Sequence, residues 1–98
     1  MPGLADMHMH TREDWLSKDW PVCPLNLYLA NGVTTIRDFG PAGRSSTYAL
    51  RWREEIKKGK QSGPTIYAAG PILYGPVEDP QGIVRRQKAQ GFDFIKLY

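Results

Sequence analysis

The feature that most constrains this chain is a regular alternation of apolar segments with helix-like segments. Segment 3–8 is a short mixed run after Pro2 that is consistent with a strand, and segments 33–39, 65–69 and 92–97 also have the composition of strands. Segments 25–30, about 45–58 and about 81–90 have the composition of helices, the second with Ser45 or Ser46 as its N-cap. A glycine follows each helix, at Gly32, Gly59 and Gly91. This order predicts an α/β fold whose parallel strands are joined by crossover helices.

Charge and composition exclude several classes of function. The net charge is +3, but Glu54 and Glu55 interrupt the first basic group and no aromatic residues are spaced for stacking on bases. We therefore interpret the basic groups as solvated helix faces and expect no nucleic-acid partner. No apolar run is long enough to span a membrane, so we expect no membrane partner. Cys23 is the only cysteine, which agrees with a reducing compartment, and we expect a cytoplasmic protein.

His8 and His10 are the strongest candidates for chemistry. Side chains two residues apart on an extended chain point to the same side, so both imidazoles share one face of the first strand. Two imidazoles on one face can bind one metal ion at about 2.0–2.1 Å each. Alone, such a pair is weak evidence for a site. Its place at the carboxyl end of the first strand, where α/β barrels carry their chemistry, strengthens the interpretation.

Two aspartates are candidates for supporting roles at the same end of the strands. Asp6 precedes His8 by two residues, so we expect it to be a buried hydrogen-bond partner that holds the strand end in place. Asp38 closes the second strand. It is either a residue that supports the metal ligands or contacts substrate, or an aspartate that forms the turn before Gly40-Pro41.

Three motifs along the chain resemble signatures of the amidohydrolase superfamily, metal-dependent hydrolases of the Xaa-Pro dipeptidase and imidazolonepropionase-like kind. Residues 2–10 (PGLADMHMH) resemble its first strand, and residues 31–38 (NGVTTIRD) resemble its second strand. Residues 91–96 (GFDFIK) resemble the fourth strand of members that carry a carboxylated lysine. The motifs occur in the family's order. The resemblance implies that residues 1–98 form one partial barrel domain, strands one to four of a (β/α)₈ TIM-type barrel.

The resemblance also implies a metal-dependent hydrolase of amide-like C–N bonds, acting on a dipeptide or a cyclic amide. His8 and His10 would bind the more buried metal, and Lys96, carboxylated by carbon dioxide, would bridge it to a second one. The expected cofactors are one or two zinc ions and the lysine carbamate. A carbamate offers two anionic oxygens, whereas a free ammonium repels cations. The ions would keep a hydroxide deprotonated for attack on the carbonyl. In the alternative, a mononuclear deaminase-like relative, Lys96 stays unmodified.

The chain departs from the family in length. Family members complete the metal site with histidines after the fifth and sixth strands and an aspartate after the eighth. A whole barrel needs roughly 250 residues, and the 98 residues of this chain reach only the fourth strand. We assign no catalytic residue within the chain and expect the isolated fragment to be inactive. The open edges of four parallel strands would invite self-association. The remaining alternative is a non-catalytic half-barrel that binds a metal weakly, or that pairs with a second half supplied by another chain or by a copy of itself.

Overall fold

The computed structural model describes residues 2–17, 22–40 and 47–98. The elements in chain order are β1 (Leu4–Met9), the 3₁₀ helix η1 (Glu13–Leu16), α1 (Pro24–Ala30), β2 (Val33–Asp38), α2 (Thr47–Lys57), β3 (Thr65–Ala68) and α3 (Pro80–Ala89). Three strands and three α-helices therefore alternate as the sequence predicts. The expected caps of the second helix, Ser45 and Ser46, lie outside the described residues. No described helix is long and apolar enough to cross a membrane.

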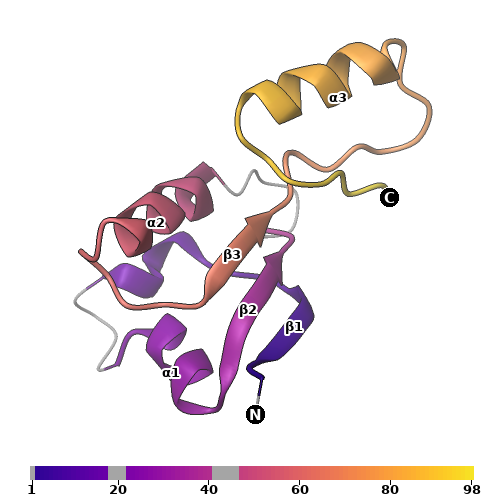
Figure 1. Cartoon of the computed structure of the whole chain (residues 1–98). Coiled ribbons are helices and arrows are strands. Elements are labelled where there is room, and N and C mark those ends of the chain that lie inside the picture. Colours follow the sequence, from indigo (N-terminus) through magenta and orange to yellow (C-terminus); the bar gives the residue numbers. More distant parts are fainter. Residues whose placement is uncertain (1, 18–21, 41–46) are drawn as a thin grey trace.

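The three strands form one parallel sheet in the order β1-β2-β3 (Figure 1). β2 and β3 are in continuous register, with Ile36 beside Ile66 and Asp38 beside Ala68. β1 pairs with β2 less regularly, and its register shifts between Asp6 and Met9. The α/β class predicted from the sequence is confirmed. The described sheet is open and has three strands, so it does not by itself make a barrel.

The core lies between one face of the sheet and the helices α1 and α2. Ile36 and Ile66 are buried on this face, together with Trp52 of α2 and Leu25 of α1. Because side chains alternate along a strand, Arg37 of β2 and its partner Tyr67 of β3 lie on the opposite face. That face is not covered by the two helices. A ligand can therefore reach the ends of the strands from the face of the sheet that α1 and α2 leave uncovered.

The fourth strand expected at 92–97 is not a strand in the structure. This segment makes two isolated parallel bridges, Ala69 with Phe94 and Leu73 with Leu97. Between the two bridges the register slips by one residue, because the Gly70 N–H donates to the Phe94 carbonyl and the next donor, the Leu73 N–H, bonds the Lys96 carbonyl. The segment therefore pairs with its neighbour at two points and does not form a continuous ladder.

The segment after α3 is nevertheless fastened beside β3. The Asp93 carboxylate accepts hydrogen bonds from the Ala68 backbone N–H at 2.9 Å and from Arg53 at 2.6 Å. The backbone N–H of Asp93 donates to the carbonyl of Ala68 at 3.0 Å. Figure 1 shows this segment and α3 beyond the carboxyl end of β3. The attachment carries Lys96 to the same end of the sheet as the histidines.

Candidate metal centre

A cavity of about 460 Å³ lies at the carboxyl ends of the strands and brings the candidate ligands together. Its lining residues are His8, His10, Ile72, Tyr74, Lys96 and Tyr98. His8 and Lys96 are far apart in the sequence, and the parallel topology brings them to one cavity. All three residues that we predicted as metal ligands therefore line the same cavity.

The two imidazoles stand close together, with ring centres 5.4 Å apart. The Nδ1 of His10 lies 2.6 Å from the carbonyl oxygen of Gly40. Because a carbonyl only accepts, the proton of His10 belongs on Nδ1, which leaves the lone pair of Nε2 available. Metal-binding histidines are commonly oriented by this kind of hydrogen bond. The sequence did not reveal Gly40 in this role, although its place after the second strand puts it beside His10.

Phe39 connects the histidine pair to Lys96. Its buried ring lies 4.2 Å from the His8 ring, measured between centres, and the Lys96 Nζ lies 4.7 Å from the centre of the Phe39 ring. A cation above an aromatic face is stabilised by the ring quadrupole. Phe39 therefore limits where His8 and Lys96 can sit. The sequence alone does not mark Phe39 as a site residue, because an aromatic residue at a strand end is typical of a hydrophobic core.

Asp38 is fully buried and braces the backbone on both sides of the site. Its Oδ1 accepts from the Thr11 N–H at 2.9 Å and the Gly40 N–H at 2.8 Å, and its Oδ2 accepts from the Thr11 hydroxyl at 2.6 Å. Thr11 follows His10 directly, and Gly40 is the residue that His10 contacts. Asp38 thus forms the turn at the end of β2 and holds the backbone of Thr11 and Gly40 on either side of the His10 contact.

Asp6 supports the other histidine. Its half-buried carboxylate accepts a hydrogen bond from the backbone N–H of His8 at 3.1 Å. The contact is made to the backbone and not to the His8 ring. The sequence predicts a buried partner at this position, whereas Asp6 is only half-buried and braces the backbone of the strand end.

Tyr48 completes the buried network, and its hydroxyl has one proton to donate. The Thr11 hydroxyl donates to Asp38, so the Tyr48 hydroxyl donates toward Thr11, whose carbonyl oxygen is 2.8 Å away and whose Oγ1 is 2.9 Å away. Burial raises the pKa of Tyr48 above its ordinary value of 10.0, and the nearby Asp38 raises it further. The phenol therefore stays protonated in the folded chain.

We expect this shift to appear as a loss of stability in alkali. The folded-state pKa lies above the unfolded value, so the contribution is complete below pH 10.0 and is lost as pH rises above it. Urea unfolding between pH 8 and pH 11 should show a decline that is shallower in Tyr48→Phe. At neutral pH the same variant should lose about 1–2 kcal/mol of unfolding free energy, because the Thr11 carbonyl loses a donor. Equal alkaline slopes in both proteins would contradict the assignment.

The donors in the cavity are compatible with a metal ion but do not complete its coordination. Two imidazoles bound to one zinc ion at about 2.0–2.1 Å would place their ring centres at roughly the separation of the His8–His10 pair. Within residues 2–17, 22–40 and 47–98, no three His, Cys, Asp or Glu side chains gather closely enough to hold a metal. The described residues thus supply two nitrogen donors, with Lys96 as the neighbouring side chain.

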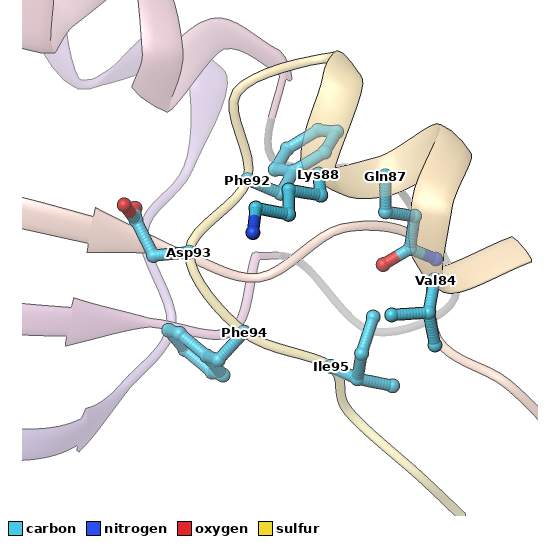
Figure 2. A pocket seen from close by; sticks show the side chains of 7 residues that line it. All are labelled: Val84, Gln87, Lys88, Phe92, Asp93, Phe94 and Ile95. Carbon is cyan, nitrogen blue, oxygen red and sulfur yellow. The ribbon is translucent and has the colours of Figure 1, made fainter. Parts of the chain in front are cut away.

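A second cavity, of about 380 Å³, lies between α3 and the segment that follows it (Figure 2). Figure 2 shows the Asp93 carboxylate pointing away from Gln87 and Val84. That carboxylate is already occupied by Arg53 and the Ala68 N–H. The amide of Gln87 donates to the carbonyl of Pro71 at 2.9 Å. This cavity contains no imidazole, and the first cavity remains the candidate site.

Comparison with known proteins gives structural likeness only. No protein-family model matches the chain, and no curated protein matches it. The structure of a "putative prolidase" from Bifidobacterium longum covers 99% of this chain with a TM-score of 0.71 and 26% identity. The structure of a Xaa-Pro dipeptidase with methionine bound in its active site covers 98% of this chain with a TM-score of 0.63 and 24% identity.

This chain spans 26% of the first of these proteins and 33% of the second. At 24% identity, the second likeness is evidence for the fold alone. The name of the first agrees with the dipeptidase part of the resemblance seen in the sequence. No family model confirms the amidohydrolase superfamily itself. The comparisons therefore establish that the chain shares its fold with a part of a prolidase-like protein and a part of a Xaa-Pro dipeptidase.

Proposed function

We propose that this chain is the metal-binding first part of a hydrolase that cleaves amide-like C–N bonds in a dipeptide or a cyclic amide. The observation that carries the proposal is the single cavity lined by His8, His10 and Lys96. The likeness to a prolidase-like structure supports the same reaction class. We further propose the amidohydrolase superfamily and a (β/α)₈ barrel, of which the parallel β1-β2-β3 order would be the first part. The expected partner is a small-molecule or peptide substrate in the cytoplasm.

In this proposal the chain's own residues hold and orient the metal. His8 and His10 would be ligands, with His10 binding through Nε2 because its Nδ1 donates to Gly40. Asp38 keeps Gly40 and Thr11 in position on either side of that contact. A bound divalent ion would supply Lewis acidity and would lower the pKa of a water molecule toward neutrality. The groups that complete the coordination and move the proton are not among the described residues, so the isolated chain should not turn over.

Zinc binding by the chain and its variants tests this proposal. The 98-residue chain would be titrated with zinc in bicarbonate buffer, and its affinity would be measured by calorimetry. Because the described residues supply only two nitrogen donors, we expect weak zinc binding by the chain and at least about a tenfold lower affinity in His8→Ala and His10→Ala. Lys88→Ala, which removes a lysine from the second cavity, is the matched control and should bind zinc as the unchanged chain does. Equal zinc affinities in all four proteins would contradict the proposal.

One observation favours the mononuclear alternative, in which Lys96 is not carboxylated. Its Nζ lies over the Phe39 ring at 4.7 Å and near the Tyr98 ring at 5.7 Å, an environment that stabilises an ammonium. A carbamate, which is anionic, would lose both of these contacts. Native mass spectrometry in bicarbonate separates the two forms. A mass increase of one carbon dioxide that disappears in Lys96→Arg would favour the two-metal form, and its absence would favour a single ion.

A further inference from the structure

Two exposed tyrosines form part of the wall of the candidate metal cavity. Tyr74 is 57% exposed and Tyr98 is 81% exposed, and both line the cavity. Their ring centres lie 5.7 Å apart with planes inclined at 41°. Large aromatic surface left open beside convergent polar groups is a common feature of ligand sites.

Backbone pairing determines that these rings face the cavity. Leu73 pairs with Leu97, and the two segments exchange hydrogen bonds from Leu73 N to Lys96 O at 3.0 Å and from Tyr98 N to Leu73 O at 2.9 Å. Because neighbours alternate along extended backbone, the residues flanking Leu73 and Leu97 point opposite to those leucines. Four side chains therefore share the cavity face: Ile72, Tyr74, Lys96 and Tyr98.

The charges around the rings indicate which side chain of a ligand could lie there. The lining side chains include Lys96, whose Nζ lies 5.7 Å from the centre of the Tyr98 ring. A cationic ligand side chain placed on the two rings would lie beside this ammonium and would be repelled. An uncharged apolar or aromatic group would instead gain contact with Ile72 and the two rings.

We propose that Tyr74 and Tyr98 form an aromatic subsite next to the metal ligands. The subsite binds an uncharged apolar or aromatic side chain of the amide substrate and disfavours a cationic one. This inference rests on the proposed function, because the metal site would hold the scissile amide while the subsite holds the adjacent side chain. It adds a preference among amide substrates that the metal site alone does not determine.

The test titrates the 98-residue chain, with and without zinc, with the amides of N-acetyl-phenylalanine, N-acetyl-alanine and N-acetyl-lysine. NMR shifts of the Tyr74 and Tyr98 ring protons report binding. We expect the phenylalanine amide to bind about two- to tenfold more tightly than the alanine amide, and the lysine amide to bind no more tightly than the alanine amide. Tyr74→Ala should abolish this preference. Tyr67→Ala removes a tyrosine that is 46% exposed and outside the cavity lining, and should retain the preference.

Equal affinities for the three amides, or no ring-proton shift up to tens of millimolar, would overturn the inference. An equal loss of preference in Tyr67→Ala would also overturn it. The same titrations test the metal proposal independently. If the unchanged chain does not bind zinc but still prefers the phenylalanine amide, the metal site is rejected and the aromatic subsite is retained. If the chain binds zinc but shows no preference among the amides, the aromatic subsite is rejected and the metal site is retained.

Discussion

Replacing Asp38 by alanine is expected to destabilise the chain by about 3–5 kcal/mol and to abolish zinc binding. The carboxylate is fully buried and accepts three hydrogen bonds, so its removal leaves two backbone N–H groups and a hydroxyl without their acceptor. A small domain has only about 5–15 kcal/mol of total stability, so a large part of it would be lost. Urea unfolding followed by circular dichroism measures the change.

Asp38→Asn separates hydrogen bonding from charge. The amide oxygen can still accept from Thr11 N and Gly40 N, which both contact Oδ1. The amide nitrogen can donate to the Thr11 hydroxyl, whose proton can then turn toward Tyr48, 2.9 Å away. We expect a loss of only about 1–2 kcal/mol. Asp14→Ala, which removes an exposed aspartate paired with Arg12, should change stability by less than about 0.5 kcal/mol. An alanine variant as stable as the asparagine variant would contradict this account.

Replacing Trp52 by alanine should cost about 3–5 kcal/mol. Trp52 is 0% exposed, and its ring centre lies 4.8 Å from that of Tyr48. It belongs to the cluster that joins α2 to the sheet, so the substitution leaves a large cavity beneath Ile36 and Ile66. The midpoint of urea unfolding should fall accordingly, and the alanine variant should be partly unfolded at 37 °C.

Trp52→Phe is expected to be much milder than alanine. The indole Nε1 of Trp52 is buried and has no hydrogen-bond partner among the described residues, so phenylalanine removes a polar group whose burial costs free energy. Retaining one aromatic ring should limit the loss to about 1–2 kcal/mol. Leu27→Ala on α1, where the side chain is half-exposed, should cost less than about 1 kcal/mol. A phenylalanine variant as unstable as the alanine variant would mean that the indole N–H does have a partner.

Much of the fold could be predicted because its signals are local. Gly32, Gly59 and Gly91 adopt positive φ angles where each helix ends, as a helix C-terminus favours. The strand compositions located β1, β2 and β3 to within a residue or two. The segment at 92–97 is the exception, because its register against the neighbouring segment slips by one residue between the two bridges. Strand composition describes one segment, whereas a ladder requires two.

The sequence predicts the candidate metal ligands, but it does not predict the residues that hold them in place. His8 and His10 follow from a two-residue spacing, and Lys96 came from the resemblance of its motif. The network of Asp38, Thr11 and Tyr48 joins residues 27 and 37 positions apart in the sequence, and no local pattern marks such contacts. Phe39 was missed for a similar reason, since its contact with Lys96 exists only after the chain has folded.

The most direct test of the central claim is X-ray absorption at the zinc edge on the zinc-loaded chain. If His8 and His10 bind one ion, the spectrum should contain two imidazole nitrogens at about 2.0–2.1 Å, with the outer-shell scattering typical of histidine rings. The scattering of one imidazole ring should be lost in His10→Ala, and that of both rings should be lost in the double variant His8→Ala/His10→Ala. A spectrum without imidazole scattering, or one that the double variant leaves unchanged, would contradict the claim that this pair is a metal site.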